Sequence, residues 1–130
     1  MAVIEYARNV LKIKKATSSE FSKTGVNVIG LIHEWNRDGK IFKGSKKELG
    51  GTMRLGLYEA KLKKNSLIQK IYRSNSINER HRHRYEVNID YKDKFEDKGL
   101  IFSGMSPDHK LPEILELKNH PWFIGVQFHP

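Results

Sequence analysis

The second half of the chain alternates short apolar segments with short connections, and this pattern restricts the folds that it can adopt. Strand-like segments cover residues 100–104, 111–117 and 122–128, and a helical turn at 91–98, ended by Gly99, precedes them. Strands outnumber helices in this half. These features predict a layered α/β fold in which at least one part of the sheet is antiparallel.

The first half begins with a helical pattern. The expected elements are a helix at 2–13, a strand at 26–32, turns at 38–39 and 50–51, a strand at 52–62 and a helix at 66–72. The second helix should bury Leu67, Ile68 and Ile71. The first helix has no capping residue before it and carries the α-amino charge at its start, so we expect that an upstream segment is missing. No repeat or linker interrupts the sequence, which predicts one domain over residues 1–130.

Composition narrows the class of protein. No run of about 18 apolar residues exists, so no membrane partner is expected, and the N-terminus lacks the order of a signal peptide. The absence of cysteine excludes disulfides and thiolate metal sites and favours a cytoplasmic location. The net charge of +9 is compatible with nucleic-acid binding, but aromatic residues are not interleaved with the lysines as stacking platforms. Anionic small molecules such as nucleotides suit this charge equally well.

A histidine lies at the end of the last strand candidate. His129 follows an apolar segment, and α/β folds commonly place site residues at the carboxyl ends of strands. Its reference pKa of about 6.5 suits a general base near neutral pH. On residue type alone, a histidine without a role is the favoured interpretation.

Arginine and histidine alternate in the middle of the chain. In an extended segment, Arg80, Arg82 and Arg84 share one face, and His81 and His83 share the other. Three guanidinium groups on one face can bind a carboxylate or a phosphate. The histidines have no evident third ligand, so no metal site is predicted. The alternative is a solvated basic edge.

Two further segments have structural interpretations. Glu20 lies in a Ser/Thr-rich loop, where a carboxylate is usually a surface residue or a helix cap. Residues 119–123 are expected to form a turn that anchors the last strand by burying its aromatic side chains.

Four motifs together resemble one family. They are residues 50–56 (GGTMRLG), 79–88 (ERHRHRYEVN), 120–123 (HPWF) and 126–130 (VQFHP). The last is a general feature of class I glutamine amidotransferases, and the other three are similar to the C-terminal glutaminase domain of CTP synthases. The resemblance covers essentially the whole chain. It implies a three-layer α/β domain with a mixed sheet, which hydrolyses glutamine with a Cys-His-Glu triad.

The resemblance also implies roles for individual residues. His129 matches the triad histidine, Arg84 the arginine that holds glutamine, and Glu20 an acidic residue also assigned to glutamine. The ammonia is passed to a synthase domain, which aminates UTP with ATP and Mg²⁺ in pyrimidine biosynthesis. No cofactor is expected in this chain. The implied partners are glutamine, the synthase domain or an upstream fragment, and further copies in an oligomer.

The departures from the family are as informative as the matches. The family's nucleophilic cysteine precedes its first helix and its triad glutamate follows the His-Pro pair, and this sequence contains neither. The N-terminal strands, the nucleophile turn and the synthase domain are also expected to be missing. We therefore expect the chain alone to be inactive, and to be oligomeric or prone to aggregation. A non-catalytic module that docks on a full-length CTP synthase remains an alternative, as does a basic nucleic-acid-binding protein.

Overall fold

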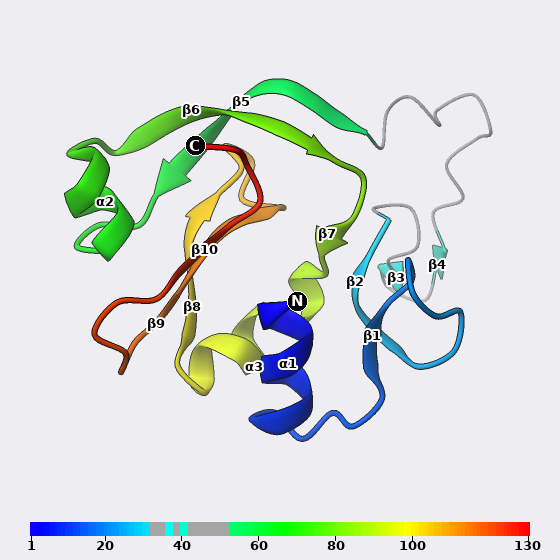
Figure 1. The fold of residues 1–130 in the computed structure, drawn as a ribbon. Coiled ribbons are helices and arrows are strands. Elements are labelled where there is room, and N and C mark those ends of the chain that lie inside the picture. The colour runs from blue at the N-terminus through cyan, green and yellow to red at the C-terminus, as the bar shows by residue number, and fades with distance from the viewer. Residues whose placement is uncertain (32–35, 38–39, 42–52) are drawn as a thin grey trace. The chain divides into compact units, whose positions relative to one another are not determined.

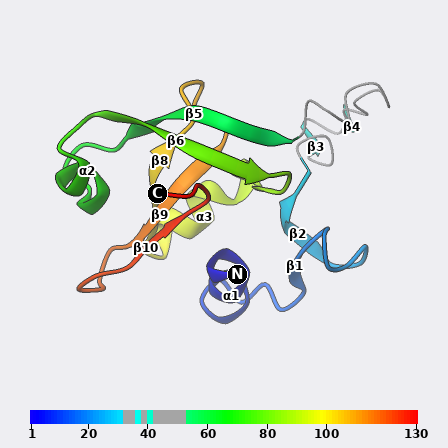
Figure 2. The ribbon, with the colours of Figure 1, turned by 45° about the horizontal axis from the view of Figure 1, so that its top comes forward.

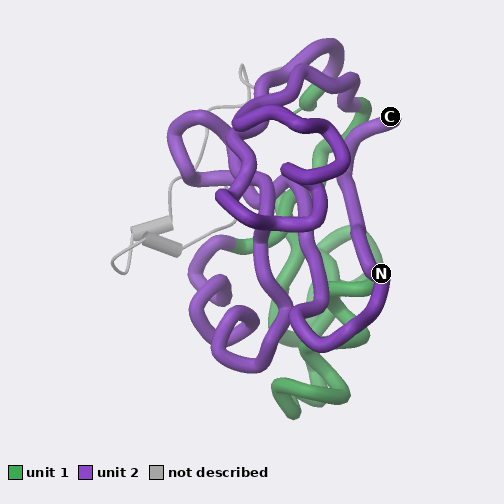
Figure 3. Tube along the Cα trace, turned by 90° about the vertical axis from the view of Figure 1, so that its left-hand side faces the viewer, with its two compact units in different colours: residues 1–54, 82–88 green, residues 55–81, 89–130 purple. Residues whose placement is uncertain are grey.

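The computed structural model describes residues 1–31, 36–37, 40–41 and 53–130 (Figure 1). They form two compact units, one of residues 1–54 and 82–88 and the other of residues 55–81 and 89–130 (Figure 3). The expected turns at 38–39 and 50–51 lie outside the described residues.

The first unit is built on a small mixed sheet. Its elements are α1 (Ala2–Asn9), β1 (Ala16–Ser18), β2 (Val26–Gly30), the pair β3 (Asn36–Arg37) and β4 (Lys40–Ile41), and β7 (Glu86–Val87). Strand β2 lies between β1, to which it is parallel, and β7, to which it is antiparallel. The apolar face of α1 is buried and contacts β1 and β2. The predicted strand at 26–32 is confirmed as β2.

The first helix is shorter than its sequence pattern predicts. It ends at Asn9 and not at residue 13, because Lys12 adopts a left-handed backbone conformation with φ 61°. The chain then turns, and the Ile13 N–H donates to the carbonyl of Ala7 at 2.9 Å. Val10 is consequently exposed, although its spacing placed it on the apolar face.

The second unit is built on a five-stranded sheet in the order β10-β9-β8-β5-β6 (Figure 2). Its elements are β5 (Arg54–Leu62), α2 (Leu67–Tyr72), β6 (Ser76–His83), the 3-10 turn η3 (Ile89–Tyr91), α3 (Lys92–Asp97), β8 (Leu100–Met105), β9 (Pro112–Leu117) and β10 (Ile124–Val126). The pairs β5–β8, β8–β9 and β9–β10 are antiparallel, which confirms the predicted antiparallel section. The last strand is shorter than the predicted 122–128.

The end of the chain connects the two edges of this sheet. Strands β10 and β6 are the outermost strands, yet the segment after β10 returns to β6, where Arg80 and His129 form an isolated antiparallel bridge (Figures 1 and 2). The sheet therefore curls toward closure. Its interior holds a cluster of buried apolar side chains: Ala60, Leu62, Ile68, Ile77, Ile114 and Phe128.

The backbone N–H groups at the N-terminus of helix α2 have hydrogen-bond acceptors. The Ser66 hydroxyl accepts from the Gln69 N–H at 3.2 Å, and the Glu116 carboxylate accepts from the N–H groups of residues 67 and 68 at 2.9 Å each. The predicted helix is confirmed and Ile68 is buried, but Ile71 is 45% exposed, which corrects its expected core position. Tyr72, one turn after Ile68, packs against the core instead.

The turn before the last strand also differs from expectation. Residues 118–122 do turn, but Trp122 is 62% exposed and does not anchor β10. The His120 ring packs edge-on against Phe123, with ring centroids 5.7 Å apart, and its Nδ1 accepts from the Trp122 N–H at 3.1 Å. The backbone of Trp122 is thus held while its indole faces solvent. None of the helices in the described part of the chain is long and apolar enough to cross a bilayer.

A glycine in β8 permits the close approach of β9. A Cβ added at Gly104 would lie 2.5 Å from Cδ1 and 2.9 Å from Cβ of Ile114. We expect Gly104→Ala to lower the free energy of unfolding by about 1–3 kcal/mol, because the β-branched side chain cannot move aside. Gly125→Ala is the matched control with a smaller effect, since its new Cβ would meet the flexible Leu115 side chain at 3.0 Å. Urea unfolding measures both, and an unchanged Gly104→Ala midpoint would contradict this expectation.

Candidate active site

His129 combines a fixed backbone with an exposed side chain. Its N–H donates to the carbonyl of Arg80 at 2.9 Å, and the preceding Phe128 is buried in the core. The imidazole itself is exposed. The expectation that His129 directly ends a strand is corrected, because β10 ends at Val126 and the bridge to β6 holds the histidine beyond it. A ring placed in this way is anchored by the main chain and open to a substrate.

A buried polar pair lies beneath this segment. His81 is 2% exposed and Glu113 1% exposed, and Nε2 of His81 lies 3.4 Å from Oε2 of Glu113. The His81 ring packs edge-on between Tyr58 and Phe128, at centroid distances of 5.6 Å and 5.8 Å. Sequence reasoning noticed His81 but missed Glu113. The available signal was a carboxylate in a mainly apolar strand segment, which also contains Glu116.

The predicted alternation of residues 80–84 is largely confirmed. Arg80 and Arg82 are exposed, while His81 is buried and His83 half-buried. The strand ends at His83, so Arg84 belongs to the connection that follows it, and its side chain is also exposed. The described residues contain no cluster of three or more His, Asp or Glu side chains that could hold a metal ion.

Arg84 and Glu20 both belong to the first unit, whereas His129 belongs to the second. Glu20 follows β1 with its side chain exposed, and its N–H donates to the Ser18 hydroxyl at 3.2 Å. Sequence reasoning missed Glu86, which is fully buried close to Arg84 in the chain. Its Oε1 lies 3.8 Å from Nη1 of Arg54 and 3.4 Å from Nδ1 of His83. Contacts with the side chains of Arg54 and His83 thereby hold Glu86, and with it the segment next to Arg84, in place.

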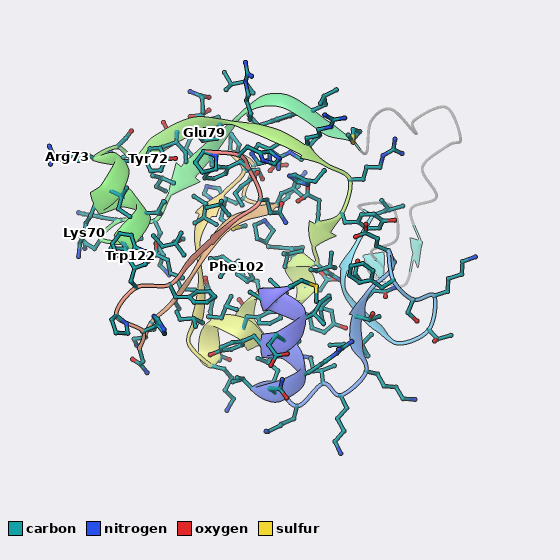
Figure 4. The ribbon with its side chains drawn as sticks, in the orientation of Figure 1. Lys70, Tyr72, Arg73, Glu79, Phe102 and Trp122 are labelled. Carbon is teal, nitrogen blue, oxygen red and sulfur yellow. The ribbon has the colours of Figure 1, made fainter. Side chains whose placement is uncertain are left out.

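A second ionisable pair in the second unit joins α2 to β6. The Tyr72 hydroxyl donates to Oε1 of Glu79 at 2.7 Å, and the two side chains lie next to each other in Figure 4. Burial, the hydrogen bond and the nearby negative charge of Glu79 raise the pKa of Tyr72 from 10.0 to about 12.

This pair predicts a pH-dependent contribution to stability. Folding favours the protonated phenol, so the contribution is complete below pH 10 and is lost as pH rises toward the folded pKa of about 12. We expect Tyr72→Phe to lower the free energy of unfolding by about 1 kcal/mol at pH 8, with the difference from the parent shrinking above pH 10. Urea unfolding of both proteins from pH 8 to 11.5 measures this. If the difference in free energy of unfolding between Tyr72→Phe and the parent stays constant over that range, the pKa of Tyr72 is not raised by folding.

Comparison with known proteins places this chain in one family. The chain belongs to the glutamine amidotransferase class-I family, which it matches over residues 1–130. It is 73% identical to the CTP synthase of Pelagibacter ubique over 130 residues and 61% identical to that of Zymomonas mobilis over 131 aligned residues. In both cases the alignment covers all of this chain and 24% of the length of the relative. The resemblance to CTP synthases is therefore confirmed.

A solved structure confirms the fold class. The Trypanosoma brucei CTPS glutaminase domain with bound acivicin superimposes with a TM-score of 0.81 at 34% sequence identity. The match covers 99% of this chain and 48% of that one. The mixed α/β architecture expected from the motifs is thus the architecture of a class I glutamine amidotransferase domain.

Proposed function

We propose that this chain is part of a CTP synthase and contributes the histidine side of the glutaminase site, which hydrolyses glutamine to supply ammonia. The observation that carries this proposal is the exposed imidazole of His129 on a backbone fixed by β6. A general base has to reach its proton at hydrogen-bond distance and keep its position, and this arrangement serves both needs.

His129 acts as the acid–base group in this proposal. It removes the proton from a cysteine thiol, which then attacks the side-chain amide of glutamine, and it returns a proton to the leaving ammonia. The 130 residues contain no cysteine, so the nucleophile comes from a segment outside them. The polypeptide of these residues alone should consequently release no ammonia from glutamine above the level of its His129→Ala variant.

Arg84 and Glu20 hold the ends of the substrate in this proposal. The guanidinium fork of Arg84 suits the α-carboxylate of glutamine, and the carboxylate of Glu20 suits its α-ammonium. Both side chains are exposed, so both are available to a ligand. The ammonia then serves a synthase domain that uses ATP and Mg²⁺ to aminate UTP, within an oligomer.

A non-catalytic module is the second candidate function. The absence of cysteine favours it, because a chain without a nucleophile can still dock on a complete CTP synthase. Such a module would bind the complete enzyme without restoring any activity to a partner that lacks these residues.

A chimera tests the proposal. These 130 residues replace the matching part of the Pelagibacter ubique CTP synthase, to which they are 73% identical. CTP formation is then measured with glutamine and, separately, with an ammonium salt as the nitrogen source. We expect activity with both. A chimera that uses ammonium but not glutamine would contradict the glutaminase role, because its synthase domain would be intact.

A further inference from the structure

The segment that carries His129 is held by two strands that are not neighbours in the sheet. The N–H of Gln127 donates to the carbonyl of Glu113 in β9 at 3.1 Å, and the N–H of His129 donates to the carbonyl of Arg80 in β6 at 2.9 Å. Strands β8 and β5 separate β9 from β6 in the sheet order. The position of His129 therefore depends on how far the sheet curls.

The buried pair connects the same two strands. Glu113 supplies one anchoring carbonyl, and His81 directly follows the residue that supplies the other. Their side chains approach to 3.4 Å in the interior of the second unit. Phe128, between the two anchored residues, rests its ring against His81 at a centroid distance of 5.8 Å. The side-chain pair thus spans the same gap as the segment.

We propose that the His81–Glu113 pair is a positioning element that sets the distance between β6 and β9 and thereby the place of His129 in glutamine hydrolysis. This inference rests on the proposed function of His129. A carboxylate removed from water interacts strongly with a nearby imidazole, so the pair has a narrow range of favourable separations. Apolar side chains of similar volume tolerate a shift of the strands. Because reaction rates depend steeply on placement, a displacement of about 1 Å at His129 is sufficient to lower turnover.

The test separates positioning from folding in the CTP synthase chimera. The double variant His81→Phe/Glu113→Leu replaces both residues of the pair with apolar side chains that keep the interior filled. Such exchanges of buried charged pairs are often neutral or stabilising. We expect an unchanged or higher melting temperature and unchanged ammonium-dependent CTP formation. The kcat for glutamine hydrolysis should fall about 10- to 100-fold, with little change in KM, because Arg84 and Glu20 are untouched.

Two further variants complete the experiment. Glu113→Gln retains the length and hydrogen-bonding capacity of the side chain and should recover most of the lost kcat. Tyr72→Phe/Glu79→Gln is the matched control, since it alters the polar pair that joins α2 to β6 and should leave kcat unchanged.

The outcomes separate the positioning role from the proposed function. A folded double variant with the kcat of the parent overturns the positioning role. If the double variant does not melt cooperatively, Glu113→Asp decides, because it retracts the carboxylate from His81 by one methylene. Its kcat should fall at constant KM, and a parental kcat overturns the inference. A parent chimera without any glutaminase activity overturns the proposed function instead.

Discussion

The His129→Ala chimera is expected to lose glutamine-dependent CTP formation while its ammonium-dependent reaction continues. Loss of a general base costs about 10²- to 10⁴-fold in rate, and removal of a member of a nucleophile–histidine unit reaches about 10⁶-fold. We therefore expect a fall of at least about 10⁴-fold in kcat with glutamine. Ammonia release from glutamine, measured by a coupled assay, gives the number directly.

The His129→Ala substitution should remove the imidazole without disturbing the fold. His129 is anchored through its N–H, which alanine retains, so the bridge to Arg80 is preserved and only the imidazole is removed. The side chain is exposed, so its loss leaves no cavity. Equal melting temperatures of parent and variant serve as the control. Glutamine turnover above one tenth of the parental rate would show that His129 is not the acid–base group.

Arg84→Ala should produce the second large effect, and on binding rather than on chemistry. Loss of a bidentate contact to the α-carboxylate should raise the KM for glutamine about 10²-fold, at a cost of about 3 kcal/mol. Arg84→Lys keeps the charge but not the fork, so it should recover only part of the affinity. Initial rates of ammonia release over a range of glutamine concentrations measure these changes.

The neighbouring Arg82 provides the matched control. Its side chain is also exposed, and it carries the same charge two residues earlier in the chain. Arg82→Ala should leave the KM for glutamine within about twofold of the parent, as expected for a surface substitution away from the site. If Arg82→Ala and Arg84→Ala raise the KM equally, the effect belongs to the general positive charge of the segment and not to a specific contact.

The strands and the alternating exposure of the residues in β6 could be predicted because they depend on local pattern. Period-two alternation correctly placed Arg80 and Arg82 on the face opposite His81, and the fold makes the arginine face the exposed one. The apolar segments at 100–104 and 111–117 correctly predicted two strands, which pair in the structure as β8 and β9. The roles of His129, Arg84 and Glu20 came from the family motifs and stay predictions, since no composition or spacing argument alone gave His129 a role.

The burial of charged and aromatic side chains could not be predicted, because it depends on residues that are distant in the sequence. Glu113 is buried against His81, and the residues that surround each of them in the sequence do not indicate that the two are in contact. In the same way, the spacing of Ile71 matched an apolar face that Tyr72 fills in the folded protein. Helix α1 ended early for a local reason, the left-handed conformation of Lys12, that a periodicity argument does not contain.

The bridge between His129 and β6 also affects the outer edge of the sheet. An outermost strand offers unpaired main-chain groups, to which a second molecule can add its own strand. The main chain of His129 occupies that position beside Arg80. The residues that present the imidazole therefore also cover one place on the outer edge of β6, beside Arg80, where a second strand could otherwise pair.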